Sequence, residues 1–294
     1  MTRINKVLLS AGIHGNEKTG IYLIEKLRQN SNLTSRDNFT VETLLINTKA
    51  IALNRRYYEI DLNRCFDLKQ INNNESRYYE QSLAKEIYER VKESQFDFIL
   101  DFHTSTSNMG LTLLLSNSNP FNLQLAAYLT SIDPEIKIVR TDNSKDKNRF
   151  RHLFAYGFTV EMGAIAPNVI DSVWFERGEK LVRQILDYIE QTNRQQQPPS
   201  PESIAVYSLC DTVYFPVDEN RKIVGMVHPN IHGNDYRALK PGEPMLVKFN
   251  GESIVYRGKN TVYPIFVNEA AYWENQIAMY LTTKEEVAIS TVRQ

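Results

Sequence analysis

Apolar segments alternate with longer amphipathic segments over the first two thirds of the chain. Short runs that are apolar at successive positions are typical of strands buried on both faces of a parallel sheet. Six such runs are KVLLSAG (6–12), VETLLIN (41–47), FDFILDF (96–102), LTLLLS (111–116), IKIVRT (136–141) and FTVEMG (158–163). This alternation predicts an α/β fold, with a mixed, mostly parallel sheet flanked by helices.

Two amphipathic segments between or after these runs predict helices that cover the sheet. Residues 75–93 and 171–193 both carry apolar side chains at spacings close to the helical repeat, which places them on one helix face. The positions expected on the inner faces are Tyr79, Leu83, Ile87 and Val91 in the first segment, and Val173, Leu181, Ile185 and Ile189 in the second.

A change of composition near residue 195 predicts a domain boundary. The segment QTNRQQQPPSPES (191–203) is polar and proline-rich, which is typical of an extended linker. Beyond it, short β-type runs are punctuated by Pro, Gly, Asn and Asp, and no long helical pattern follows. We therefore divide the chain into an α/β domain at 1–197 and a smaller C-terminal all-β domain at 198–294.

Charge and cysteine content narrow the class of protein. The 294 residues include 34 Lys+Arg and 35 Asp+Glu, for a formal net charge of -1. A balanced chain lacks the positive excess that nucleic acids and acidic membranes attract, so neither is an expected partner. Two cysteines, Cys65 and Cys210, cannot build a disulfide framework, which favours a reducing, cytoplasmic location.

No segment has the length or composition of a membrane-spanning or targeting element. The apolar runs are shorter than the ~20 residues that a transmembrane helix needs. Residues 1–13 begin with charge and end on small residues, as a signal peptide does. Their apolar core, however, is shorter than the ~7–15 residues of an h-region, so we expect a first strand there.

Two of the five histidines follow apolar strands directly. His14 comes after the first run, and His103 ends the extended run FDFILDFH. In open α/β sheets, ligands bind outside the carboxyl ends of the strands. Glu17 follows His14 by three residues, so a ring nitrogen and a carboxylate oxygen can converge on Zn²⁺. Taken alone, each histidine is better explained as a strand-end or buried core residue, but their joint placement with Glu17 predicts a zinc site, with Asp101 orienting His103.

Glu161 is an acidic residue inside the otherwise apolar run FTVEMG. Burying a carboxylate without a partner costs several kcal/mol, so the position needs an explanation. One interpretation is a structural ion pair with an arginine. The other is a general base, because burial raises the pKa of a carboxyl group toward the range where it exchanges protons with a metal-bound water.

Two basic stretches are candidates for substrate binding. Residues 54–64 (NRRYYEIDLNR) and 145–154 (KDKNRFRHLF) concentrate arginines and amides. The planar guanidinium group binds carboxylates through two hydrogen bonds and can stabilise a developing oxyanion. An anionic substrate is therefore expected, although an arginine-rich stretch is also common in solvated surface loops.

Five ordered motifs resemble the aspartoacylase family, the aspartoacylase and succinylglutamate desuccinylase group of zinc-carboxypeptidase-like hydrolases. The motifs are HGNE (14–17), DLNR (61–64), DFHTSTSNMG (101–110), VEMG (160–163) and VYPIFVNEAAY (262–272). They extend over nearly the whole chain, which makes a chance match remote. The resemblance implies a catalytic zinc hydrolase domain at 1–197 and a C-terminal β domain at 198–294 that borders the active site.

The resemblance also implies the catalytic roles. By position in the motifs, His14, Glu17 and His103 correspond to the ligands of one Zn²⁺ per subunit. Glu161 corresponds to the residue that acts as general base and then general acid. Arg56 corresponds to the arginine that polarises the scissile carbonyl and stabilises its oxyanion.

Four further residues correspond to substrate-binding positions of the family. Asn63 and Arg64 match the pair that binds a substrate carboxylate, and Arg151 matches the arginine for a second, side-chain carboxylate. Tyr272 matches a tyrosine that reaches the site from the C-terminal domain. One difference stands out: where related enzymes often have a tyrosine shortly before Arg151, this chain has Lys147, Asn148 and Arg149.

The activity that the resemblance implies is zinc-dependent hydrolysis of N-acyl-L-aspartate, foremost N-acetyl-L-aspartate, to L-aspartate and a carboxylate. Alternatives with the same chemistry are deacylation of succinylglutamate or of an N-acyl aromatic amino acid. A carboxypeptidase and a non-catalytic metal-binding protein on this scaffold are further alternatives. The expected partner is a small anionic N-acyl amino acid, and the family suggests a homodimer.

Overall fold

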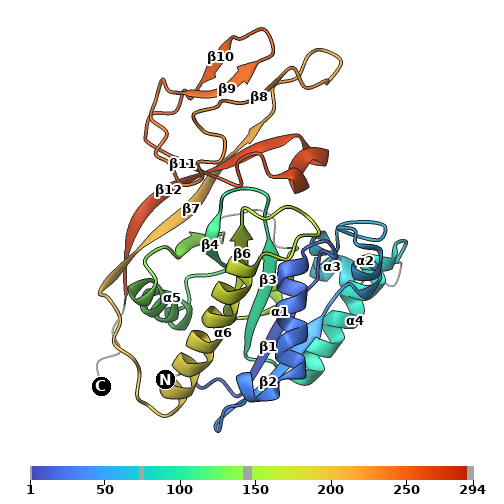
Figure 1. Ribbon diagram of the computed structural model, residues 1–294, viewed down its shortest axis with the longest axis vertical. Helices are drawn as coiled ribbons and strands as arrows, with labels where there is room; N and C mark the ends of the chain where they lie inside the picture. Colours follow the sequence, from blue (N-terminus) through green and yellow to red (C-terminus); the bar gives the residue numbers. More distant parts are fainter. Residues whose placement is uncertain (1, 73–75, 142–147, 290–294) are drawn as a thin grey trace.

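The centre of the molecule is a nine-stranded sheet, seen in a computed structural model that describes residues 2–72, 76–141 and 148–289 (Figure 1). The strand order is β11-β12-β7-β5-β4-β6-β3-β1-β2. The six predicted runs form β1 (Lys6–Ala11), β2 (Thr40–Leu45), β3 (Phe98–Thr104), β4 (Gly110–Leu115), β5 (Lys137–Arg140) and β6 (Tyr156–Gly163). Strands β2, β1, β3 and β6 are parallel neighbours, whereas β4 runs antiparallel to β6. The predicted mixed, mostly parallel sheet is confirmed.

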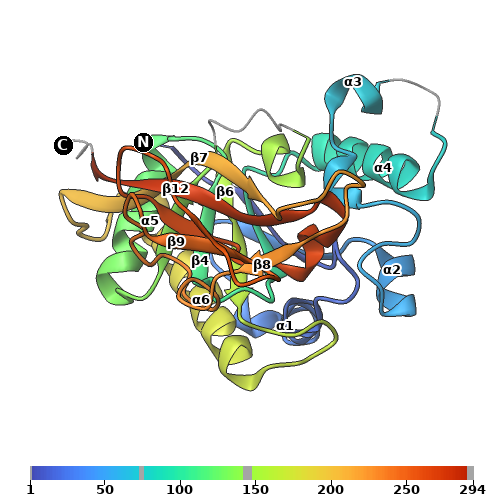
Figure 2. The same cartoon turned by 90° about the horizontal axis from the view of Figure 1, so that it is seen from above.

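Helices cover both faces of the α/β part of this sheet. They are α1 (Lys18–Gln29), α2 (Thr48–Leu53), α3 (Leu68–Ile71), α4 (Tyr79–Ser94), α5 (Pro120–Ile132) and α6 (Ser172–Asn193). Side chains alternate along a strand, and in β1 Val7 and Leu9 join the core under α1, α5 and α6, whereas Leu8 joins the core under α4. The view from above shows α1 and α6 together on one side and α4 on the other (Figure 2).

The inner face predicted for α6 is correct at three positions and wrong at one. Leu181, Ile185 and Ile189 are buried, but Val173 is 63% exposed. Val173 and Leu181 are eight positions apart, so at about 100° per residue their side chains lie about 80° apart around the helix. Val173 therefore faces solvent in the first turn, although its residue type fits the apolar pattern.

The C-terminal part is all-β apart from short 3-10 turns, as expected, and it continues the central sheet. The long strands β7 (Ser203–Tyr214) and β12 (Ile277–Ala288) pair antiparallel, and β7 joins β5 through Val139 and Tyr207. A three-stranded sheet of β8 (Gly225–Val227), β9 (Pro244–Lys248) and β10 (Ser253–Val255) lies above, and β11 (Tyr263–Ile265) flanks β12. Figure 1 shows β8, β9 and β10 beyond the end of the central sheet where β6 finishes. The division at residue 197 stays a prediction.

Among the described residues, none of the helices combines the length and the apolar character required to cross a bilayer.

A substitution at Gly157 tests whether the close approach of β6 to β3 requires a glycine at this position. Its φ is +119°, and a Cβ there would lie 2.0 Å from the Ile99 carbonyl oxygen. We expect Gly157→Ala to lower the free energy of unfolding by roughly 3 kcal/mol or more, because a backbone clash adds to the conformational strain. Gly233 has φ +71° but open space around it, so Gly233→Ala should cost about 1 kcal/mol. Equal losses in urea denaturation would contradict the close-approach explanation.

Candidate active site

The three candidate metal ligands His14, Glu17 and His103, here called the metal-type residues, lie at the carboxyl ends of neighbouring parallel strands. His14 and Glu17 lie in the turn between β1 and α1, and His103 lies near the end of β3, the strand beside β1. Glu161 stands opposite His103 in the register of β3 and β6. Because parallel strands finish at one edge of the sheet, residues far apart in the chain meet there.

One cavity of about 690 Å³ is lined by every residue that the sequence singled out for the site. These residues are His14, Glu17, Arg56, Asn63, Arg64, His103, Arg151, Glu161 and Tyr272. Arg149 lines the cavity as well, whereas Lys147 lies outside the described residues. Within the described chain, His152 is not among the lining residues. The structure thus brings the predicted set together, and the role of each member is taken up below.

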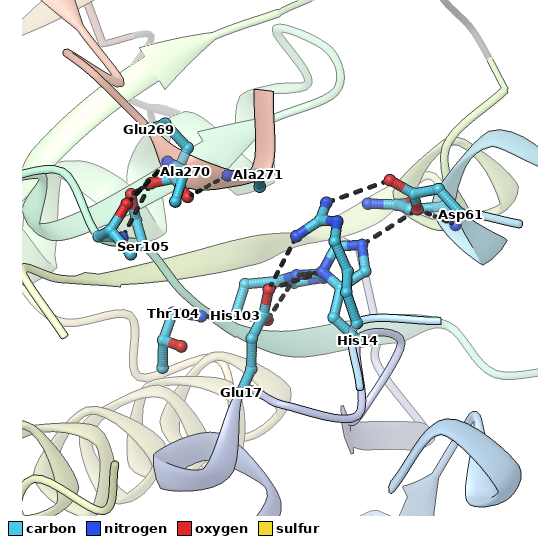
Figure 3. Close-up of polar contacts among 12 residues, drawn as sticks. His14, Glu17, Asp61, His103, Thr104, Ser105, Glu269, Ala270 and Ala271 are labelled. Carbon is cyan, nitrogen blue, oxygen red and sulfur yellow. Dashed lines mark hydrogen bonds and ion pairs between the residues drawn. The ribbon is translucent and has the colours of Figure 1, made fainter. Parts of the chain in front are cut away.

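The side chains of His14, Glu17 and His103 point toward one another and are buried (Figure 3). The Glu17 carboxylate has Oε1 2.6 Å from His14 Nδ1 and Oε2 3.0 Å from His103 Nδ1. The two Nδ1 atoms are 3.2 Å apart, and one ligand atom from each residue lies within 4.8 Å of the others. The three residues therefore present nitrogen and oxygen donors to one small volume.

The outer nitrogens of both histidines face carboxylates. His14 Nε2 is 3.1 Å from Asp61 Oδ1, and His103 Nε2 is 2.9 Å from Asp101 Oδ2. These contacts favour a proton on each Nε2, so both Nδ1 lone pairs point at the Glu17 carboxylate. Each close contact between a ring nitrogen and the carboxylate needs a cation, either a proton on the ring nitrogen or a metal ion shared by the set, and a His-Glu-His set with carboxylate-oriented rings suits Zn²⁺. The expected contact between Asp101 and His103 is present.

Burial and the neighbouring charges shift the pKa values of the acidic groups in opposite directions. Burial raises the pKa of the Glu17 carboxyl, but His14 and His103 outweigh it and hold that pKa well below its usual range. For Glu161, burial dominates over the attraction of His103 and raises the pKa to about 8. A carboxyl group in that range can take up and release a proton near neutral pH, as a general base and acid must.

Asp61 organises the cationic side of the cavity, a role that the sequence patterns did not reveal. Its Oδ2 is 3.1 Å from Arg56 Nη2 and 3.9 Å from Arg64 Nη2, and its Oδ1 accepts a hydrogen bond from the Asn63 backbone N–H at 2.9 Å. Burial raises the pKa of Asp61, but His14 and Arg56 hold it well below its usual range. One carboxylate thus contacts His14, Arg56 and Arg64 together. The available signal was its position before the 3-10 turn η2 (Leu62–Arg64), where Asp is a favoured cap.

Arg151 reaches the same cavity because the 3-10 turn η3 (Phe150–Leu153) is joined to η2. The Phe150 N–H donates to Asn63 Oδ1 at 3.2 Å, and the Phe66 N–H donates to the Asn148 carbonyl at 3.2 Å. Arg151 Nη2 donates to Thr141 Oγ1 at the end of β5. The two basic stretches of the sequence therefore form adjoining walls.

Comparison with known proteins identifies the family. Residues 3–189 match the profile described as succinylglutamate desuccinylase/aspartoacylase catalytic domain, and residues 202–284 match the AstE/AspA barrel-sandwich hybrid domain. The chain belongs to the succinylglutamate desuccinylase/aspartoacylase family. Family membership makes it an enzyme, an amidohydrolase, as the resemblance implied.

Relatives in this family match the chain over its length. A protein of Trichodesmium erythraeum named "Probable aspartoacylase" is 43% identical over 98% of this chain and 100% of its own. The N-acyl-aromatic-L-amino acid amidohydrolase (carboxylate-forming) of Xenopus tropicalis is 33% identical over 99% of this chain and 96% of its own. The crystal structure of murine aminoacylase 3 has a TM-score of 0.94 at 31% identity, with 100% of both chains covered.

Glu269 is a second carboxylate of this family member that sequence patterns left unassigned. It is 7% exposed and lies before the 3-10 turn η4 (Ala270–Asn275), which carries Tyr272. Its Oε2 accepts hydrogen bonds from the hydroxyls of Ser105 and Ser107 and from two backbone N–H groups of residues 106–107, directly after His103 (Figure 3). Glu269 therefore joins the C-terminal part to the segment behind the metal-type site.

Glu269→Ala should lower the free energy of unfolding by roughly 2–4 kcal/mol, because three buried donors and one partly buried donor lose their shared acceptor. Denaturation monitored by fluorescence of the aromatic C-terminal part provides the measurement. Glu219 lies exposed in the same part of the chain, so Glu219→Ala serves as the matched control and should stay within about 0.5 kcal/mol of the parent. A loss no larger than that of the control would show that this contact does not hold the two parts together.

Proposed function

We propose that this amidohydrolase is a zinc enzyme that hydrolyses N-acyl-L-aspartate, foremost N-acetyl-L-aspartate, to L-aspartate and a carboxylate. The observation that carries the proposal is the meeting of a His-Glu-His donor set, the half-buried Glu161 and several arginines around one cavity. The 43% identical relative, whose name is "Probable aspartoacylase", supports the same choice.

His14, Glu17 and His103 would hold one Zn²⁺ per subunit, and the bound ion supplies Lewis acidity and lowers the pKa of a coordinated water. Glu161 faces these residues from the neighbouring strand. It takes the proton as water attacks the acyl carbonyl, and it delivers a proton to the amine as the C–N bond breaks. The raised pKa, about 8, suits both directions of transfer.

Arg56 is the residue proposed to stabilise the oxyanion that develops on the acyl carbonyl. Its guanidinium is 3.1 Å from Asp61 and 3.5 Å from Glu17, so it stands directly beside the donor set. Burial lowers the pKa of Arg56, but the negative charges of Asp61 and Glu17 outweigh this effect and raise the pKa above its usual value. The guanidinium therefore stays charged throughout the working pH range. A fixed cation at this position requires no reorganisation during the reaction.

The substrate's α-carboxylate is assigned to Asn63 and Arg64, and its side-chain carboxylate to Arg151. Two arginines of one short segment, Arg149 and Arg151, line the cavity and favour an acidic side chain over a neutral one. Tyr272, half-buried at the cavity wall, would contact the bound substrate from the C-terminal part.

An N-acyl aromatic amino acid is the second candidate substrate. The rings of Phe266, Tyr272 and Tyr280 pack against one another and line the cavity, with the Tyr272 and Tyr280 centroids 5.4 Å apart. Such a wall could accept an aromatic side chain, and the Xenopus tropicalis relative carries that activity in its name. Succinylglutamate belongs to the same test panel. Homodimer formation and a cytoplasmic location remain further predictions.

The decisive measurement combines zinc content with a substrate panel of N-acetyl-L-aspartate, N-succinyl-L-glutamate and N-acetyl-L-phenylalanine. We expect a zinc-to-chain ratio near one and the highest kcat/KM on N-acetyl-L-aspartate. Glu161→Gln should keep the metal but lose at least about a hundredfold in kcat, since proton transfer is removed. Parent-like turnover by this variant would overturn the role of Glu161, and zinc-free protein with full activity would overturn the zinc assignment.

Arg151→Ala tests whether Arg151 binds the side-chain carboxylate of the substrate. We expect kcat/KM for N-acetyl-L-aspartate to fall about a hundredfold, because a charge-assisted contact with the second carboxylate is lost. The internal control is N-acetyl-L-alanine, whose neutral side chain cannot use this arginine and whose kcat/KM should change little. An equal loss on both substrates would refute the assignment of Arg151 to the side-chain carboxylate.

A further inference from the structure

Glu80 is a buried carboxylate outside the cavity whose backbone hydrogen-bond donors all lie between Arg56 and Asp61. It lies in the first turn of α4 with 0% of its surface exposed. Its oxygens accept hydrogen bonds from the backbone N–H groups of three successive residues, Tyr58, Glu59 and Ile60, at 2.6–3.3 Å. The Asn47 side-chain amide donates a further bond at 3.2 Å. No ion pair to Glu80 occurs among the described residues.

A buried charge that is held only by neutral donors needs a reason, because its desolvation is costly unless every oxygen is hydrogen-bonded. The structure offers a reason, because the Glu80 carboxylate binds the backbone of one particular segment. Residues 54–61, here named the arginine loop, run from the end of α2 to Asp61. Tyr58 is 44% exposed and Glu59 is exposed, and only Ile60 of these three packs against a hydrophobic core. The hydrogen bonds to Glu80 therefore add to a small apolar contact in fixing the loop.

Both ends of the arginine loop belong to the active site. At its first end, the Arg56 carbonyl accepts a hydrogen bond from the Gly15 N–H beside His14. At its last end, Asp61 contacts His14 and precedes Asn63 and Arg64. Only residues 57–60 connect the two ends. The curvature that Glu80 imposes on them therefore sets the position of Arg56 relative to the residues assigned to the substrate carboxylate.

Asn47 ties the same anchor to the strand that carries the metal-type residues. Its backbone N–H donates to the Gly12 carbonyl just after β1, and its Oδ1 accepts from the Ala50 N–H at the start of α2. In return, Glu59 in the arginine loop accepts a hydrogen bond from the Tyr79 N–H at the start of α4. Through Asn47, Glu80 is thus connected by hydrogen bonds to the end of β1 and the start of α2, in addition to its place in α4.

We propose that Glu80 is a positioning residue of the reaction: its carboxylate holds the arginine loop so that Arg56, Asn63 and Arg64 face one substrate. This inference rests on the proposed function, since it assigns Glu80 to the binding of an N-acyl amino acid carboxylate. Glu80 itself does not line the cavity in the described chain and is not a catalytic residue.

The test compares Glu80→Gln with two control variants of α4 under zinc-replete conditions. Gln keeps the size of the side chain but replaces one acceptor oxygen by an NH₂ donor, which opposes the N–H groups of the loop. We expect the KM for N-acetyl-L-aspartate to rise at least about tenfold, with zinc content unchanged. Ala84→Gly destabilises the same helix at a buried position, and Glu89→Gln removes an exposed charge from it.

The controls separate positioning from stability. A variant that is only less stable has fewer active molecules, which lowers the apparent kcat and leaves KM unchanged, and we expect this of Ala84→Gly. Glu89→Gln should match the parent in both constants. A folded Glu80→Gln enzyme with the parent KM would overturn the inference, whereas a parent enzyme that hydrolyses no member of the panel would overturn the proposed function instead.

Hydrogen exchange on the parent protein gives a reading that requires no variant to fold. The N–H groups of Tyr58, Glu59 and Ile60 should exchange at least about a hundredfold more slowly than in an unstructured peptide, despite the exposure of the loop. Exchange at the unstructured rate would show that the anchor is not formed and would overturn the inference independently of any activity.

Discussion

The structure of the site depends on one buried carboxylate, Glu17, held between two imidazole rings. Both of its oxygens face ring nitrogens, and the outer nitrogens of those rings face further carboxylates, Asp61 and Asp101. This alternation of acids and imidazoles fixes the tautomer of each ring and directs lone pairs to the centre. A cation at that centre would satisfy the whole set, so the geometry is compatible with a metal site.

The rest of the site extends this arrangement through carboxylates that accept hydrogen bonds from the backbone. Asp61 receives the Asn63 N–H, Glu80 receives three successive N–H groups of the arginine loop, and Glu269 receives those of residues 106–107. Loops at a substrate cavity cannot be fixed by a thick apolar core without closing the cavity. Buried acids with several donors give the same rigidity in a smaller volume, and each leaves a large penalty if a partner is lost.

The sequence predicted the parts of the molecule whose signal is local. Runs such as KVLLSA and FILDFH are apolar over successive positions, so the buried parallel strands were predictable, and with them the meeting of His14 and His103. Strand β12 was not predicted, because its second half, TTKEEVA, is mostly exposed and polar. Glu80 and Glu269 were beyond prediction for a different reason. Both accept hydrogen bonds from backbone N–H groups, which every residue except proline has, and the contact between Glu269 and the Thr106 N–H spans 163 positions.

The continuation of the sheet into β7 and β12 explains how the C-terminal part can take part in the chemistry. Strand β7 is hydrogen-bonded to β5, and β12 to β7 over almost its full length, so η4 leads directly into a strand that is integral to the central sheet. Glu269 then fastens the start of η4 behind His103, and Tyr272 follows three residues later at the cavity wall. The wall facing the substrate is therefore attached on one side to the sheet and on the other to the strand that carries a metal-type histidine. Because Glu269 holds both, a change in the C-terminal part that breaks its hydrogen bonds also disturbs the segment of residues 105–107 that follows His103.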